Sequence, residues 1–256
     1  MSSPYIIWTM QRTGGTTLAQ VLATLSEYQG VQHEPFNAER MFGAITTAFA
    51  ADGDIDALKS KLEQALADKP VIKHCYELLP PEQNAALMQV STASGYKHII
   101  LDRRAEADRI LSLELARATG AWGGSEAKEI LGKIARGGAP LPELNRTRAL
   151  HHLGQCRLRR GEMLAELGSR GIEPFVVYFE DIYSDFEAGK RLILRILAFL
   201  GIDPNAKAGA DKMIDDALTN NGQNSASVLN TLSSVVMLRD DLAKAWNCPQ
   251  GMFAPS

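Results

Sequence analysis

Short apolar runs alternate with longer amphipathic stretches through the chain. The first run that reads as a strand begins at Tyr5, and the others cover residues 31–33, 70–74, 96–101 and 174–179. Between them, apolar residues recur at the three- and four-residue spacing of a helix that packs on a core. These helical stretches are residues 18–25, 55–66, a segment starting at Pro80 and Pro81, and residues 105–119, 144–168 and 186–200. The alternation predicts an α/β fold with three α/β/α layers around a central parallel sheet.

Bulk properties fit one domain and exclude several classes of protein. The 256 residues, 45% of them apolar, suit a single domain over residues 1–256 with a sizeable core. A formal charge of −3 gives no field that attracts a polyanion, so nucleic acid is not expected as a partner. The three cysteines lack the spacing of a zinc site or a disulfide framework. Because neither a signal-peptide pattern nor a membrane-length apolar run is present, we expect a soluble cytoplasmic protein.

The first strand runs into a turn that favours binding of an anion. At the start of a helix, backbone N–H groups lack intrahelical partners, and the helix dipole adds positive charge. The turn combines an arginine, threonine hydroxyls and two glycines that permit close approach: Arg12, Thr13, Gly14, Gly15, Thr16 and Thr17. The sequence therefore predicts a phosphate or sulfate site near the N-terminus.

The composition of this loop points away from ordinary ATP or GTP chemistry. The Gly-x-x-x-x-Gly-Lys-Ser/Thr loop of nucleoside triphosphatases requires a second glycine and a lysine that are missing here. The loop resembles instead the 5′-phosphosulfate loop of sulfotransferases, which use 3′-phosphoadenosine 5′-phosphosulfate (PAPS). Many of them have lysine at the position of Arg12, whereas bacterial carbohydrate sulfotransferases of the trehalose and lipopolysaccharide type often have Gln-Arg-Ser-Gly-Ser-Thr. The resemblance implies a P-loop-type fold and PAPS as the sulfuryl donor.

A second segment resembles the 3′-phosphate motif of the same family. Arg103 and Arg104 follow the strand at residues 96–101, and Ser112 comes eight residues after Arg104. Two arginines at the end of a strand form a strong donor fork for a phosphate, to which the serine can add a hydroxyl. The family motif is likewise an arginine followed eight residues later by a serine. Because PAPS is anionic at both ends, we interpret the two segments as one ligand site.

A third segment extends the resemblance. Residues 175–182 and 197–201 look like the family's Tyr-Glu-Asp-Leu segment and Phe-Leu-Gly helix end, with Phe179 in place of the tyrosine. In the family this segment is chiefly architectural, so Glu180 and Asp181 are given no catalytic role. Recognisable similarity covers residues 5–37, 97–122 and 174–204. We expect residues 125–170 to form a helical segment on the acceptor side.

The resemblance also implies roles at the rim of the sheet, where parallel strands would place Arg12, Glu34, His74 and Arg104. Arg12 would stabilise charge on the 5′-phosphate and the bridging oxygen, and no metal is required. Transfer also needs a general base for the acceptor's proton. Glu34 leads, because related bacterial enzymes have a glutamate in this region. His74 and His33 are the alternatives, since cytosolic sulfotransferases use a histidine at a strand end comparable to that of His74.

Two further features stay open. The basic stretch from Arg146 to Arg160 would attract an anionic acceptor, although a solvated helix face is the ordinary explanation. Near the C-terminus, polar side chains would close over the nucleotide, as late segments do in sulfotransferases: Gln223, Asn224, Ser225 and Asn230.

The leading hypothesis is sulfuryl transfer from PAPS to a hydroxyl of a saccharide, glycolipid or small metabolite, which leaves adenosine 3′,5′-bisphosphate (PAP). One alternative is a P-loop kinase-like phosphotransferase, although the missing lysine and the Arg104–Ser112 spacing weigh against it. The other is a nucleotide-binding module without turnover. A homo-oligomer is compatible with the sequence.

Overall fold

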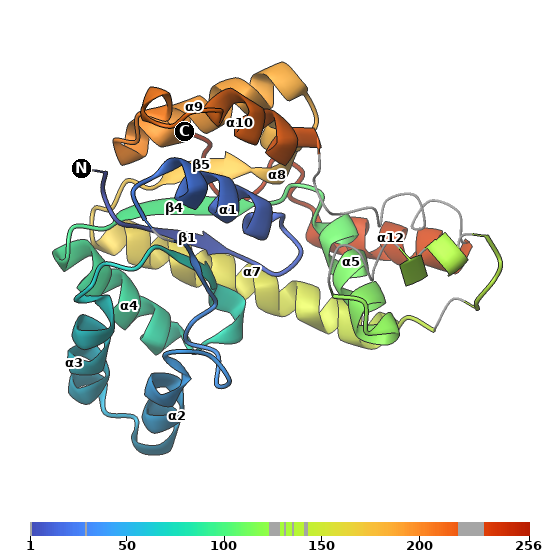
Figure 1. The fold of residues 1–256 in the computed structure, drawn as a ribbon. Helices are drawn as coiled ribbons and strands as arrows, with labels where there is room; N and C mark the ends of the chain where they lie inside the picture. The colour runs from blue at the N-terminus through green and yellow to red at the C-terminus, as the bar shows by residue number, and fades with distance from the viewer. Residues whose placement is uncertain are drawn as a thin grey trace.

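A central parallel sheet organises the chain. The computed structural model describes residues 2–28, 30–122, 129–130, 132–134, 136–140, 143–219 and 233–256. Within these residues the sheet has five parallel strands in the order β2-β3-β1-β4-β5. They are β1 (Tyr5–Thr9), β2 (Gln32–His33), β3 (Ile72–Cys75), β4 (Lys97–Asp102) and β5 (Phe175–Tyr178). Helices flank both faces (Figure 1), which confirms the predicted three-layer α/β/α fold.

One face of the sheet carries the helix that follows the anion loop. This face is covered by α1 (Gly15–Leu25), α9 (Phe186–Leu200) and α10 (Ala210–Thr219), with the short helices α8 (Phe179–Tyr183) and η2 (Pro204–Ala206) between the later elements. The apolar stripe predicted for α1 is at most 5% exposed and packs with Ile7 and Ile99 of the sheet. Burial of each such side chain contributes about 1.5–3 kcal/mol to stability.

The opposite face carries the larger core. Its helices are α2 (Gly43–Asp52), α3 (Ile55–Leu66), α4 (Pro81–Ala93), α5 (Glu106–Thr119), α7 (Arg146–Ser169) and α12 (Ser233–Trp246), and η1 (Tyr76–Leu78) follows β3. In Figure 1, α7 runs beneath the sheet towards α5 and α12. Trp8, Tyr76 and Ile100 are at most 1% exposed in this core. Within the described ranges, no helix combines the length and the apolar character needed to cross a membrane.

Most predicted elements occur within two residues of their predicted bounds. Helices α3 and α9 begin and end where the apolar spacing places them. Strand β5 ends one residue earlier than predicted, because Phe179 begins α8. Helices α2, α10 and α12 are not among the predicted elements. Helix α2 lacks a clear apolar stripe, since Gly43 and Ile45 are its only buried residues.

The helices that follow β1 and β4 lie on opposite faces of the sheet. We call the region just beyond the carboxyl ends of these two strands the β1–β4 crevice. Helix α1, which follows β1, packs in one core, whereas α5, which follows β4, packs in the other. The two strands are neighbours, with Tyr5 opposite Lys97 and Trp8 opposite Ile100. Ligands of open parallel sheets bind beyond the strands' carboxyl ends at such a point. The segments after β1 and β4 are therefore the place for a site.

Candidate functional site

The loop between β1 and α1 adopts a backbone shape that leaves the start of the helix open. Arg12 and Gly14 have left-handed φ values of 66° and 78°. The Thr13 hydroxyl donates to the carbonyl of Met10 at 2.8 Å, so this threonine braces the loop from inside. No side chain caps the N-terminus of α1. Its first backbone N–H groups are therefore available to an anion.

Both loop glycines are close to neighbouring groups. A Cβ at Gly14 would lie 2.8 Å from Cδ2 of Phe179, and one at Gly15 would lie 3.2 Å from Cγ2 of Thr9. The same Cβ at Gly15 would lie 3.3 Å from Cε of Lys73. Phe179 thus packs directly on the loop. Lys73 brings a cation beside a loop that has no lysine of its own.

Arg12 connects the loop to the second predicted motif. Its Nε donates to Oγ of Ser112 at 3.0 Å, and its Nη1 donates to the carbonyl of Trp122 at 3.4 Å. Burial lowers the pKa of Arg12 from its usual high value, which leaves it a cation at neutral pH. The structure thus brings Arg12 and Ser112 together across the β1–β4 crevice.

The two arginines after β4 have different partners. Arg103 donates from Nη1 to the carbonyl of Arg12 at 3.2 Å, and its guanidinium lies 4.6 Å from the ring centre of Phe179. Arg104 forms two hydrogen bonds with the carboxylate of Asp181, at 2.5 and 2.9 Å, which raise its pKa. Glu180 accepts from the backbone N–H of Arg104 at 3.1 Å. The Glu-Asp pair of α8 therefore holds the start of the β4–α5 turn.

Glu34 lies in a compact polar cluster next to the loop. Its backbone is left-handed, with a φ of 51°. Its carboxylate is paired with Nζ of Lys73 and accepts from Sγ of Cys75 at 3.2 Å and from Nδ2 of Asn37 at 3.1 Å. Burial acts to raise the pKa of Glu34, but the charge of Lys73 and these hydrogen bonds outweigh it and lower the pKa below its ordinary value. Glu34 is therefore ionised at neutral pH.

The two candidate histidines occupy different environments. His74 is 1% exposed, with Nε2 2.8 Å from Oδ1 of Asn84 and its ring edge-on to Trp8. Burial lowers the pKa of His74 to about 4. Its side chain thus lies in the core rather than on the rim. His33 is half-buried in β2, where burial and then the charge of Lys73 lower its pKa.

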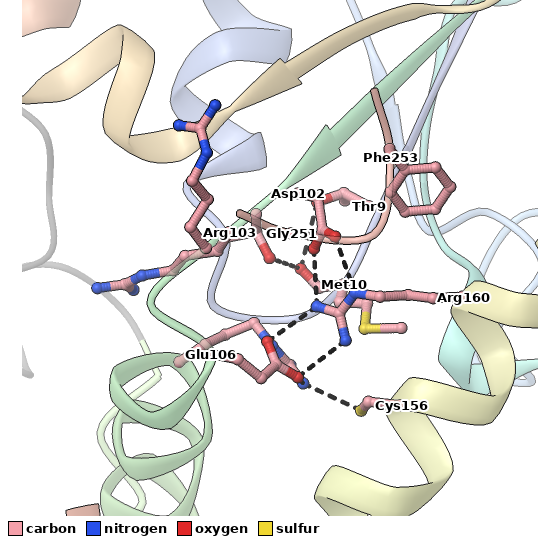
Figure 2. A network of polar contacts seen from close by, with 12 residues as sticks. Thr9, Met10, Asp102, Arg103, Glu106, Cys156, Arg160, Gly251 and Phe253 are labelled. Atoms are coloured by element: carbon pink, nitrogen blue, oxygen red, sulfur yellow. Dashed lines mark hydrogen bonds and ion pairs between the residues drawn. The ribbon is translucent and has the colours of Figure 1, made fainter. Parts of the chain in front are cut away.

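A buried ionic network that the sequence pattern does not predict underlies the site. Figure 2 shows Arg160 of α7 between Asp102 of β4 and Glu106 of α5, bound at 2.7–2.9 Å. Arg109 binds the same Glu106 at 2.7 and 2.8 Å. All four side chains are at most 1% exposed. The available signal was the three-residue spacing of Glu106 and Arg109 on one helix, but nothing local identifies Arg160 as their partner.

Carboxylates also neutralise most of the basic stretch on α7. Arg146 pairs with Asp241, Arg148 with Glu114, and Arg159 with Glu162. Because these three guanidinium groups have counterions, this helix presents a weaker positive field than its composition suggests. The polar residues Gln223, Asn224, Ser225 and Asn230 lie outside the described residues.

A surface hollow of about 480 Å³ adjoins the loop on the α1 side. It is lined by Thr16, Thr17, Gln20, Val21 and Thr24 of α1 and by Met213, Asp216 and Ala217 of α10. Thr16 and Thr17 belong both to the loop–helix junction and to this hollow. A ligand larger than a single phosphate thus has room to extend from the loop along α1.

Neither a scan against protein-family models nor a search of curated proteins finds a match to this chain.

Proposed function

We propose that this chain is a PAPS-dependent sulfotransferase that transfers the sulfuryl group to a hydroxyl of a saccharide, glycolipid or small metabolite. The observation that carries the proposal is the 3.0 Å contact between Arg12 and Ser112. It joins the two segments that resemble the 5′- and 3′-anion motifs, at the crevice where parallel sheets bind ligands. A donor with an anionic group at each end suits such a pair of segments.

The surroundings of the loop support a phosphosulfate as its ligand. The uncapped start of α1 offers backbone donors, and Gly14 and Gly15 permit close approach. We assign Lys73 to the oxygens of the bound sulfuryl group, because its Cε would lie 3.3 Å from a Cβ placed on Gly15 of the loop. It would supply the positive charge that a lysine of the loop supplies in nucleoside triphosphatases.

In the proposed reaction, Lys73, Arg12 and Glu34 act on different groups: the sulfuryl oxygens, the departing phosphate and the acceptor hydroxyl. The acceptor's oxygen bonds to sulfur while the bond from sulfur to the bridging oxygen breaks. Arg12 stabilises the charge on the departing phosphate, and Glu34 takes the hydroxyl proton. Glu34 suits this role better than His74, whose Nε2 is bonded to Asn84 in the core. When Lys73 turns from Glu34 to the bound donor, Glu34 becomes the stronger base.

Calorimetry with PAP and with ATP tests the donor site. We expect PAP to bind and ATP to bind far more weakly, with binding of PAP weakened in Arg12→Ala but not in the exposed control Arg191→Ala. Tight binding of ATP without binding of PAP would favour the kinase-like alternative. Radiolabelled PAPS incubated with a metabolite extract tests turnover, and PAP binding without any labelled product would favour a binding module.

A further inference from the structure

Side chains hold both backbone polar groups of Gln11, the residue before Arg12. The N–H of Gln11 donates to Oε1 of Glu77 at 2.6 Å, and its carbonyl accepts from Nη1 of Arg109 at 3.0 Å. Glu77 follows β3 and Arg109 lies in α5, so the two partners approach the loop from strands on either side of β1. Gln11 is thus fixed from two separate elements.

This hold acts on a backbone conformation that needs support. Arg12 has a φ of 66°, which is unfavourable for a residue with a Cβ. Such a conformation persists only where the surroundings determine it. The Gln11 carbonyl belongs to the peptide group before Arg12, and the Arg12 carbonyl, which accepts from Arg103 at 3.2 Å, belongs to the one after it. Arginine side chains therefore fix both peptide groups that flank Arg12.

Arg109 is itself held rigidly. Its side chain is fully buried and forms two hydrogen bonds with Glu106, at 2.7 and 2.8 Å, and one with Sγ of Cys156 at 3.0 Å. Arg160 in turn binds Glu106 at 2.8 and 2.9 Å (Figure 2). With the bond to Gln11, four of the five N–H donors of Arg109 have a partner. The guanidinium keeps this geometry, because any other would leave buried charges without partners.

We propose that Glu77 and Arg109 are positioning residues of the sulfotransferase reaction, which clamp the backbone of Gln11 and so hold Arg12 in the conformation that directs its guanidinium into the crevice. Neither side chain is assigned a contact with the reacting atoms. The kinetic part of this inference rests on the proposed function. The hold on the loop itself is a property of the unliganded chain and can be measured without PAPS.

The matched pair Arg109→Lys and Arg160→Lys tests the clamp. Both arginines are fully buried and bind Glu106, but Arg109 alone of the two bonds to the loop. We expect Arg109→Lys to lose protection from hydrogen exchange at the amides of residues 11–13, measured by NMR. Its kcat/KM for PAPS should fall roughly 100-fold, because a small misplacement of a catalytic group has effects of that size. Arg160→Lys should lower the melting temperature but should reduce loop protection and PAP affinity less than Arg109→Lys does, because Arg160 reaches the loop only through Glu106.

Glu77→Met provides a second test should Arg109→Lys fail to fold. Methionine is similar in length, and it removes a buried carboxylate whose Oε2 has no hydrogen-bond partner within the described part of the chain. The variant should therefore fold, lose protection at the Gln11 amide and bind PAP more weakly. Wild-type protection and PAP affinity in whichever variant folds would overturn the inference. If the wild-type chain binds no PAP, loss of protection in Arg109→Lys alone still supports the clamp, while the proposed function fails.

Discussion

Arg12 donates from Nε to Oγ of Ser112 at 3.0 Å, across 100 positions of sequence. One partner lies in the loop after β1 and the other in the helix after β4, so the bond spans the crevice between two neighbouring strands. In the unliganded chain Ser112 thus holds the guanidinium that we assign to the leaving group.

Replacing Ser112 by alanine should weaken the donor site more than the fold. A hydrogen bond to a charged group contributes about 1.5–3 kcal/mol, which corresponds to roughly a 10- to 100-fold loss of PAP affinity if the same hydroxyl serves the ligand. Calorimetry measures the affinity. The control is Ser91→Ala, which also removes a buried helical hydroxyl but lies in α4, where Ser91 bonds to Leu87 of its own helix. Equal PAP affinity in both variants would contradict the assignment.

Replacing Arg12 by glycine should separate chemistry from folding. Glycine accepts a φ of 66° without strain, so the free energy of unfolding should stay near the wild-type value. Removal of one preorganised electrostatic donor typically lowers kcat by about 10²–10³-fold. Urea unfolding measures the free energy of unfolding, and turnover of radiolabelled PAPS measures kcat. A kcat within a few-fold of wild type would remove Arg12 from the chemistry.

Replacing Glu34 by glutamine should abolish transfer and spare PAP binding. The amide keeps one oxygen, which can accept from Cys75 or from Asn37 but not from both, and it cannot take a proton from the acceptor. Single-turnover assays with PAPS measure the transfer step, and calorimetry with PAP measures binding. An unchanged rate would transfer the role of base to His33 or His74.

The buried network should make the fold sensitive to acid. Burial raises the pKa of Glu106, but the charges of Arg109 and Arg160 outweigh burial and lower it to about 2, from an ordinary value of 4.5. Because the pKa of Glu106 is lower in the folded state than in the unfolded state, its carboxylate stabilises the fold. This contribution is complete above pH 4.5 and is lost as the pH falls towards 2. The loss is on the order of 3 kcal/mol.

Urea unfolding between pH 6 and pH 2.5 measures this dependence. The Glu106→Gln variant has no carboxyl at this position, so it should start less stable and lose less on acidification. Parallel curves for the variant and the wild type would contradict the pKa given to Glu106.

Replacing Gly14 by alanine should destabilise the fold more than the same change at Gly53. Both glycines have left-handed φ values, 78° and 65°. A Cβ at Gly53 has nothing within 4 Å, whereas one at Gly14 would lie 2.8 Å from Phe179. Gly53→Ala therefore measures the backbone strain alone, on the order of 1–2 kcal/mol. Adding Phe179→Ala should recover part of the extra loss in Gly14→Ala, and no recovery would show that Phe179 does not set the spacing.

The elements of the fold that were predicted correctly are those determined by the local spacing of apolar residues. Alternating apolar runs and helical stripes define the sheet and its three layers, because each element must bury one face. The convergence of Arg12 and Ser112 on one crevice follows from parallel topology. The pairing of Arg104 with Asp181, and the position of His74 in the core, depend on which way a side chain points at the end of its strand. A one-residue shift in a strand reverses that direction, so sequence periodicity alone does not settle it.

The buried ionic network is even harder to predict from the local spacing of residues. Three other arginines of the same stretch, Arg146, Arg148 and Arg159, pair with carboxylates closer to the surface. The path of α7 beneath the sheet brings Arg160 to Asp102 and Glu106. The clamp on Gln11 is hidden for the same reason, since it joins residues from three elements. Such contacts are set by tertiary packing, which no spacing rule encodes.

The central position of β1 has a consequence for biosynthesis. This strand leaves the ribosome before β3 and β4, yet these two are its neighbours in the sheet, with Ile6 opposite both Ile72 and His98. The nascent chain therefore cannot complete the pairing of β1 until β4 has also emerged, and contacts between distant segments form slowly. Until then the apolar β1 and the stripe of α1 stay exposed to the solvent and to chaperones.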